Sequence, residues 1–280
     1  MSLEWHIIPT GQVWVDPGGP FGLVPRALWT KHQTPNENQL VPMSLTCLLI
    51  FSEGKTILVD NGMGDKLDEK GIRHWSLHFP EGDLVENLAK HGVKPEDIDI
   101  VVDTHLHSDH CSGNTTFADG KVVPTFPNAE YWVQRVEWAD AMHPDARTRA
   151  TYLLENYVPI WESGKFRFLH GDTQVTKDVR CVVSPGHTRG LQCILLEGGS
   201  RPVFYVTDLA SYAVHLERLA WVTAYDVEPL ETIRTKTHWQ RWLFENRAVI
   251  VFEHDTTLPI GELVQDNEGK FKVSPVDSRK

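Results

Sequence analysis

Thr104-His-Leu-His-Ser-Asp-His-Cys-Ser-Gly113 is the most informative segment of the chain. It places four strong metal ligands, His105, His107, Asp109 and His110, within six residues. His105 and His107 are two residues apart, so they are expected to point to the same side of an extended strand end, and Asp109 and His110 follow where the chain turns. Neutral imidazoles with a carboxylate suit zinc, with Fe, Co, Ni and Mn as alternatives. The spacing predicts two metal ions rather than one.

Three further candidate ligands stand where predicted strands end. His187 follows an apolar run and comes directly after Pro185-Gly186, which allows the backbone to turn sharply. Asp208 and His254 each close a buried apolar run in the same way. Any one of them alone is more typical of a hydrogen-bonded loop or cap residue. Their shared strand-terminal position predicts that they join the cluster at 105–110.

Composition narrows the class of protein. The chain has 280 residues and is 41% hydrophobic, which suits one sizeable domain over residues 1–280. Its formal net charge is −11, from 27 basic and 38 acidic residues, and it has no run of Lys or Arg, so nucleic acid is not expected as a partner. No stretch approaches a membrane span, and residues 1–9 lack the features of a signal peptide. We expect a cytoplasmic protein with no membrane partner.

The four cysteines are scattered along the chain, without a CxxC pair. This spacing predicts buried thiols that form no disulfide, in a reducing compartment. Cys111 adjoins His110, so it could line the metal site, although packing is its alternative role. The cysteines are Cys47, Cys111, Cys181 and Cys193.

Hydrophobic patterning predicts a β-rich, α, β-rich, α order, with a hairpin at Glu53-Gly54. The segment 17–42 reads as a long functional loop. The order favours two packed mixed β-sheets with helices outside, a four-layer αββα sandwich. Strands are expected at 5–9, 12–16, 44–52, 55–60, 97–103, 131–133, 165–169, 174–176, 179–184, 192–197, 203–207 and 248–253. Helices are expected at 83–91, 134–142, 148–161 and 228–246.

The motifs together resemble the metallo-β-lactamase-fold hydrolases. HxHxDH at 105–110 is followed by Pro-Gly-His at 185–187, then by Asp208 and His254. The resemblance extends over most of the chain, from Ile57–Met63 to Phe252–Asp255. Within this superfamily the chain is most similar to N-acyl-homoserine lactonases. The segments that carry this likeness are Leu58–Met63, His105–Asn114, Val133–Glu137, Gly171-Asp172 and Glu253–Asp255.

The resemblance implies a set of ligands for each of two metal ions. His105, His107 and His187 would hold one ion, and Asp109, His110 and His254 would hold the other, with Asp208 bridging both. Asp60 would support the site from nearby. An Asp at 208, where class B1 β-lactamases use Cys, argues against hydrolysis of β-lactams.

One departure concerns the loop after Asp208. The lactonases place a catalytic tyrosine three residues after the bridging Asp, where this chain has Ser211. Tyr212 comes one residue later and is a candidate catalytic residue if it reaches the same space. His215 could line the same pocket, with packing as the alternative.

The function predicted from these features is dinuclear zinc-dependent hydrolysis of a lactone or a related carboxylic ester by a metal-bridging hydroxide. Asp109 would shuttle the proton to the leaving alkoxide, and Tyr212 would help to stabilise the oxyanion. Residues 17–42 and 62–79 could wall the substrate pocket, or else close a core or a dimer interface. The resemblance implies a homodimer.

Other functions use the same residues. Thioester hydrolysis, as in glyoxalase II, is weakened because no helical extension is expected after His254. Phosphotriester hydrolysis would use the same metal chemistry. A nuclease is disfavoured by the acidic balance of the chain. A metal-binding protein without catalytic activity remains a further alternative.

Overall fold

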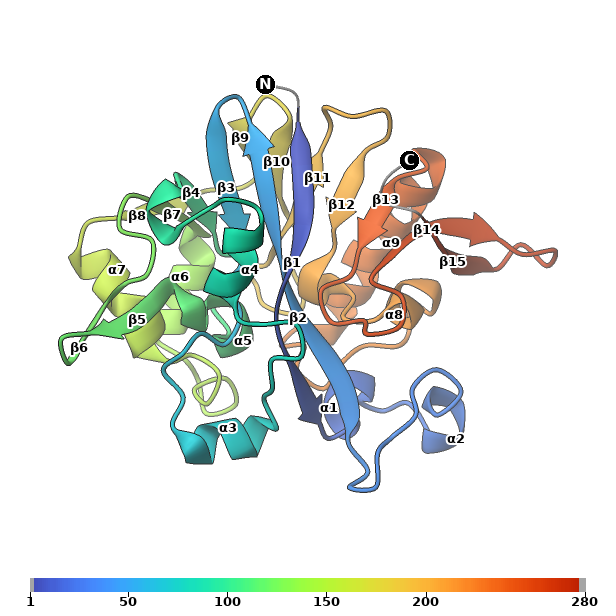
Figure 1. Cartoon of the computed structure of the whole chain (residues 1–280). Helices are drawn as coiled ribbons and strands as arrows, with labels where there is room; N and C mark the ends of the chain where they lie inside the picture. Colours follow the sequence, from blue (N-terminus) through green and yellow to red (C-terminus); the bar gives the residue numbers. More distant parts are fainter. Residues whose placement is uncertain (1–2, 277–280) are drawn as a thin grey trace. The chain divides into compact units, whose positions relative to one another are not determined.

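The computed structural model describes residues 3–276, which form two compact units (Figure 1). The first unit contains the chain up to Val13 together with Ser44–Lys177. The second contains Trp14–Met43 together with the chain from Asp178 onward. The single domain predicted over residues 1–280 stays a prediction, and each unit is best understood from its own sheet and core.

The first unit is built on a mixed sheet with the strand order β1-β2-β3-β4-β7-β8. The hairpin between β2 and β3 turns at Glu53-Gly54, where both residues have positive φ (51° and 77°), as a two-residue turn requires. This confirms the predicted hairpin. The strands of the unit are β1 (Glu4–Val15), β2 (Val41–Ser52), β3 (Lys55–Val59), β4 (Ile100–Val102), β5 (Thr115–Ala118), β6 (Lys121–Pro124), β7 (Glu130–Gln134), β8 (Phe166–Leu169) and β9 (Thr173–Thr176).

Three parallel strands, β3, β4 and β7, form the centre of this sheet. Their runs Ile57–Val59 and Ile100–Val102 are fully buried, as parallel strands covered on both faces must be. Because the strands run in the same direction, their carboxyl ends meet at one edge. Asp60 directly follows β3 at this edge. Thr104 follows β4 at the same edge and directly precedes His105 in the sequence.

Helices of the first unit follow local signals where those signals are strong. Asp83 and Glu86 form a capping box at the start of α4 and Gly92 follows its end with φ +71°, which confirms the helix predicted at 83–91. The helix predicted at 148–161 is wrong, because over these residues the structure has only η3 and most of α7. Pro159 lies in the first turn of α7, where its missing N–H is tolerated, whereas it would break a helix that continued from upstream. The helices are α3 (Glu69–Trp75), α4 (Leu84–Lys90), η1 (Pro95–Asp97), α5 (Ser108–Cys111), η2 (Ser112–Asn114), α6 (Arg135–Met142), η3 (Leu154–Asn156) and α7 (Val158–Glu162).

The second unit carries the strand order β15-β14-β13-β12-β11-β10. Parallel pairing joins β12 to β13, so their carboxyl ends also meet at one edge, before Asp208 and His254. The final hairpin was not predicted from the sequence. The strands are β10 (Val179–Val183), β11 (Gln192–Leu196), β12 (Val203–Tyr205), β13 (Val249–Val251), β14 (Ile260–Gln265) and β15 (Phe271–Pro275).

The segment 17–42 is not simply a loop. It contains two helices of four residues each, which are too short to leave a periodic pattern, and each begins directly after a proline. Phe21 and Trp29 are buried and stack with ring centroids 5.3 Å apart. The helices of the second unit are α1 (Gly18–Phe21), α2 (Arg26–Trp29), η4 (Thr207–Leu209), α8 (Ala213–Glu217) and α9 (Pro229–Glu245).

Each unit has its own apolar core. In the first, Leu49, Leu58 and Val101 pack under α4, and in the second, Phe204 and Trp239 lie with ring centroids 4.4 Å apart. All four cysteines are buried and form no disulfide, as predicted. The two large mixed sheets and their helices confirm the predicted fold class. Within residues 3–276, no helix is long and apolar enough to cross a membrane.

Lys236 is a buried charge in the second unit. Its side chain is fully buried, and Nζ donates to the carbonyls of His215 (3.1 Å) and Trp221 (2.6 Å). Burial lowers the pKa of Lys236 to about 8, although the carboxylate of Asp226 acts in the opposite direction. Between pH 8 and about 10.5, folded Lys236 therefore releases its proton before the unfolded chain does.

The unfolded state then binds more protons, so this residue should make the protein more stable as the pH rises through that window. The difference in the free energy of unfolding between the wild type and Lys236→Met should therefore change with pH in favour of the wild type. We expect this change to be at most about 1.4 kcal/mol per pH unit. Denaturant titrations at pH 8, 9 and 10 would measure it, with the exposed Lys270→Met as control. A difference between wild type and Lys236→Met that is constant with pH would contradict the prediction.

Candidate metal centre

The histidine cluster of the first unit lies just beyond the carboxyl end of β4. His105 and His107 occupy the connection, and Asp109 and His110 lie in the single turn of α5. His105 Nε2 is 3.1 Å from His107 Nδ1, and the rings of His105 and His110 are 4.0 Å apart. All three imidazoles are buried. The structure thus brings the predicted motif residues together, in a loop and a helical turn rather than in a strand end.

Asp60 holds this cluster from the end of β3. Its carboxylate accepts hydrogen bonds from Thr104 N and Oγ1, both at 2.8 Å, and lies 3.2 Å from His110 Nδ1. Its φ of +56° turns the chain so that the side chain faces the next strand. A carboxylate on Nδ1 fixes the imidazole ring and leaves Nε2 as the nitrogen available to a metal. This is the supporting role that the resemblance implies for Asp60.

Glu137 supports the same cluster from α6, a role that the sequence did not reveal. It is fully buried, and its Oε1 accepts from Leu106 N and from the Tyr152 hydroxyl, both at 2.9 Å. Leu106 separates His105 from His107, so this bond fixes the backbone between the two candidate ligands. The sequence places Glu137 only in a motif shared with the lactonases.

In the second unit, His187 is positioned by a turn that demands glycine. Gly186 has φ +141°, and a Cβ at that position would lie 2.4 Å from Thr232 N. Val227 N donates to His187 O at 3.0 Å, so a hydrogen bond joins the loop before α9 to this turn. This close approach explains why Pro-Gly precedes the histidine.

Asp208 lies between two histidines. Its Oδ2 is 3.1 Å from His187 Nε2, and its Oδ1 is 3.0 Å from His254 Nε2. His254 is fully buried, and Asp208 is 5% exposed. The second unit therefore brings together its three predicted ligands, with each carboxylate oxygen facing a different imidazole.

Asp226 completes this group and was not found from the sequence. Its Oδ1 lies 3.0 Å from His187 Nδ1 and accepts from the Thr223 hydroxyl at 2.8 Å. Burial lowers the pKa of His187, but the carboxylates of Asp208 and Asp226 outweigh it and raise that pKa to about 10. The pocket around His187 therefore favours a positive charge, which either a proton or a metal cation can supply. Asp226 sits in an irregular loop, with no strand end or motif to mark it.

Tyr212 is the N-cap residue that directly precedes α8, and it is almost fully buried. Its hydroxyl donates to the carbonyl of Pro42 at 2.9 Å, and its ring stacks on Phe21 at 5.6 Å. Burial and the nearby Asp255 raise the pKa of Tyr212 well above its usual value. Ser211 instead reaches the candidate ligand, because its hydroxyl donates to Asp208 Oδ1 at 3.0 Å. The catalytic role of Tyr212 stays a prediction.

His215 packs edge-on against both Phe21 and Tyr212, with ring centroids 5.7 and 5.5 Å away. Burial, with a smaller effect of Lys236, lowers the pKa of His215 to about 3, so the ring is neutral. Cys111 is also buried, at the end of α5. Cys111 belongs to an apolar cluster with Leu106 and Tyr157, and His215 contacts aromatic rings, so both residues have contacts typical of packing.

These residues fit a metal site by their chemistry. The first unit presents imidazole nitrogens facing each other at 3.1 Å, and the second presents a carboxylate between two imidazoles. Buried His and Asp groups of this kind are potential metal ligands, and two of the histidines have a carboxylate on the opposite nitrogen. Nitrogen and oxygen donors in this arrangement suit zinc or a similar transition metal.

Comparison with known proteins places this geometry in a family. The family sequence model for the metallo-beta-lactamase superfamily matches residues 41–258 of this chain. The chain belongs to the metallo-beta-lactamase superfamily. This match confirms the resemblance drawn from the motif at 105–110 and identifies the chain as one of the superfamily's hydrolases.

Curated relatives include N-acyl homoserine lactonases. One from Bacillus sp is 28% identical over 235 residues, which cover 80% of this chain and 86% of the relative. Another, the lactonase AttM of Rhizobium radiobacter, is 27% identical over 222 residues, covering 74% and 80%.

Solved structures agree on the fold. A probable metal-dependent hydrolase from Staphylococcus aureus matches with a TM-score of 0.87 and 26% identity, over 99% of this chain and 98% of that protein. AidC, a dizinc quorum-quenching lactonase solved with its product, matches with a TM-score of 0.76 and 21% identity, over 98% and 95%. At that identity, AidC supports the fold alone.

Asp226 offers a direct test of the positioning of His187. We expect Asp226→Asn to weaken zinc binding by about 10- to 100-fold, because a neutral amide stabilises the metal-bound imidazole less than a carboxylate does. Competition against a zinc-chelating dye would measure the affinity, with the exposed Asp266→Asn as the matched control. Unchanged zinc affinity in a folded Asp226→Asn protein would show that Asp226 has only a structural role.

Proposed function

We propose that this protein is a dinuclear zinc hydrolase that opens lactones or cleaves related carboxylic esters. The observation that carries the proposal is the Asp208 carboxylate, whose two oxygens face His187 and His254 at 3.1 and 3.0 Å. A carboxylate with each oxygen beside a different imidazole could help to hold two cations at once. The names of the lactonase relatives support the substrate class.

The proposed ligands are those expected from the sequence. His105, His107 and His187 would hold one ion, and Asp109, His110 and His254 would hold the other, with Asp208 between them. Asp60 and Asp226 each lie against the outer nitrogen of one of these histidines, which orients the inner nitrogen.

Bound zinc ions would supply a water that is acidic enough to react near neutral pH and would polarise the substrate carbonyl. The chain itself supplies the proton transfer. Asp109 is the most exposed of the proposed ligands in its cluster, with 21% of its side chain exposed and Oδ2 3.7 Å from His110 Nε2. We propose that its carboxylate carries a proton to the leaving oxygen of the ester or lactone.

Tyr212 belongs to this proposal as a hydrogen-bond donor to the oxyanion. Its hydroxyl now donates to the carbonyl of Pro42, so catalysis through this group requires exchange of that bond. Ser211, whose hydroxyl bonds Asp208, would keep the bridging carboxylate oriented.

A substrate panel tests the proposed function. Zinc-loaded protein of measured metal content should turn over N-acyl homoserine lactones or simple carboxylic esters faster, in kcat/KM, than thioesters or phosphotriesters. Activity confined to thioesters or phosphotriesters would overturn the substrate class. Absence of turnover throughout the panel in metal-loaded protein would overturn the enzymatic function.

The same panel should be run on Asp109→Asn. We expect kcat on the best substrate to fall by about 100-fold or more while zinc content is largely retained, because general acid–base catalysis typically contributes that much. Asp119→Asn is the matched control, since it makes the same change at an exposed turn with positive φ, which asparagine tolerates. Full activity in Asp109→Asn would contradict the proton-transfer role.

A further inference from the structure

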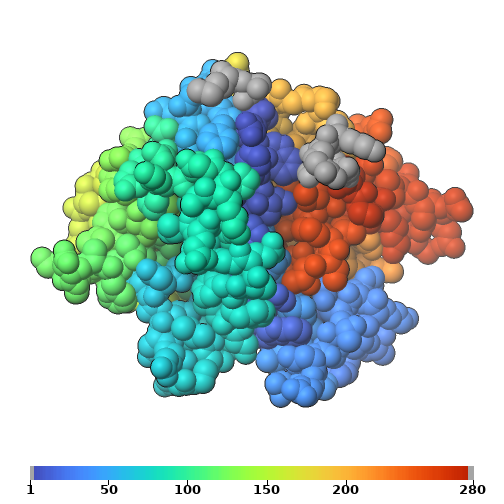
Figure 2. All heavy atoms as spheres, viewed as in Figure 1, coloured from blue at the N-terminus to red at the C-terminus, as the bar shows by residue number. Residues whose placement is uncertain are grey.

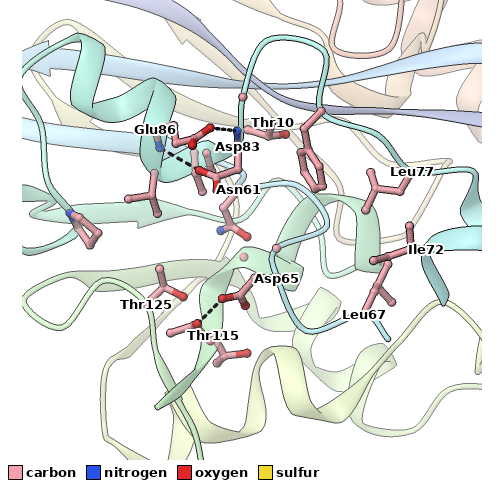
Figure 3. Close-up of a pocket in the computed structure, with 18 residues that line it drawn as sticks. Thr10, Asn61, Asp65, Leu67, Ile72, Leu77, Asp83, Glu86, Thr115 and Thr125 are labelled. Atoms are coloured by element: carbon pink, nitrogen blue, oxygen red, sulfur yellow. Dashed lines mark hydrogen bonds between the residues drawn. The ribbon is translucent and has the colours of Figure 1, made fainter. Parts of the chain in front are cut away.

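The first unit contains a cavity of about 600 Å³, within the usual range for small-molecule sites. Its lining combines residues after β3, the α3–α4 segment and the β5–β6 region (Figure 3). None of the seven proposed metal ligands lines it. For the segment 62–79 the sequence allows two roles, a wall of the substrate pocket or the closure of a core or a dimer interface. Phe79 of this segment lines the cavity, whereas Met63 and Trp75 do not.

Asn61 gives the cavity a polar centre. Its side chain is fully buried, and Nδ2 donates to Asn114 Oδ1 at 2.7 Å. The Nδ2 of Asn114 in turn donates to both carboxylate oxygens of Asp103, at 3.0 and 3.1 Å. This chain of donors fixes the orientation of the Asn61 amide and leaves its oxygen as the acceptor.

The Asn61 oxygen is buried and has no hydrogen-bond partner among residues 3–276. The hydroxyl of Thr125, which also lines the cavity, is likewise buried without a hydrogen-bond partner among these residues. Figure 3 shows Asn61 in the middle of the lining residues, between Asp83 and Glu86 on one side and Asp65 and Thr115 on the other. Burying polar atoms without partners costs free energy, so the cavity favours a ligand that donates a hydrogen bond there.

The acidic side chains that line the cavity disfavour an anionic ligand. Asp65, Asp83 and Glu86 line the cavity, whereas its described lining contains no Lys, Arg or His. The Asp65 carboxylate is held by the Thr116 hydroxyl at 2.6 Å, and Asp83 and Glu86 cap α4. The neighbouring cation, Lys66, donates to main-chain carbonyls instead. Fixed carboxylates around an unsatisfied acceptor favour a cationic donor.

An apolar wall completes the site. Leu67 and Leu77 line it, together with three large hydrophobic side chains that remain exposed on the protein surface. These are Ile72 (38% exposed), Phe79 (41%) and Val85 (44%). Figure 2 shows the segment that carries them, coloured cyan to turquoise, on the face turned toward the viewer. Exposed apolar side chains gathered at a cavity are typical of a ligand-binding rim.

We propose that this cavity binds a small primary alkylamine, with an apolar body and one protonated amino group. The ammonium group would donate to the Asn61 oxygen within the field of Asp65, Asp83 and Glu86. The alkyl body would cover Leu67 and Ile72. No proposed metal ligand lines this site, which adjoins the histidine cluster through Asn61, whose backbone N–H donates to His110 O at 2.8 Å.

Hexylamine, hexanol and hexanoate share one alkyl body and differ in their head group, so they form a direct probe set. Titration calorimetry or ligand-detected NMR on the zinc-loaded full chain should give hexylamine at least about 10-fold tighter binding than hexanoate, with hexanol between them. Equal binding of amine and carboxylate, or no binding at millimolar hexylamine, would overturn the proposal.

Variants separate the cavity from general attraction to an acidic protein. Ile72→Lys places a cation at the rim and should weaken hexylamine at least about 10-fold. Val136→Lys adds the same charge on α6, where valine is 51% exposed and lies outside the cavity, and should bind like the wild type. Asp65→Asn should weaken hexylamine and leave hexanol unchanged. Equal effects of the two lysine variants, in proteins of matched melting temperature, would overturn the assignment.

Discussion

Buried carboxylates and imidazoles are stable only when a partner compensates their charge, and this constraint governs the whole candidate centre. Asp208 is nearly fully buried, and its two oxygens face His187 and His254. Removing one partner would leave an uncompensated buried group. Asp226 and Asp60 extend the same pairing outward, since each lies against the outer nitrogen of a candidate ligand. Within each unit, the fold holds its own members of this set at hydrogen-bond distance of one another.

Parallel strand pairing supplies the positions. The carboxyl ends of β3 and β4 deliver Asp60 and the histidine cluster, and those of β12 and β13 deliver Asp208 and His254. The strands themselves need only be apolar, because both faces are covered. Most of the candidate ligands therefore lie within a few residues of a strand end, and glycine at 186 allows the turn before His187 to approach another backbone too closely for a side chain.

Local signals made much of this arrangement predictable from sequence. The Glu53-Gly54 turn, the capping box of α4 and the spacing of the motif at 105–110 depend on neighbouring residues alone. Asp226 could not be found in this way, because its role arises from contact with a histidine 39 positions away. The two short helices in 17–42 lack the length to show a period. The sequence also drew attention to Tyr212, whereas Ser211 is the residue that bonds Asp208.

Metal stoichiometry distinguishes a centre that holds two ions from one that holds a single ion or none. Elemental analysis of zinc-loaded, desalted protein should give about two zinc ions per chain, and Asp208→Asn should retain no more than one, because the bridging carboxylate would be lost. The exposed Asp266→Asn should keep two. A wild-type protein that binds one zinc ion or none, or an Asp208→Asn protein that still binds two, would contradict a centre in which Asp208 joins two ions.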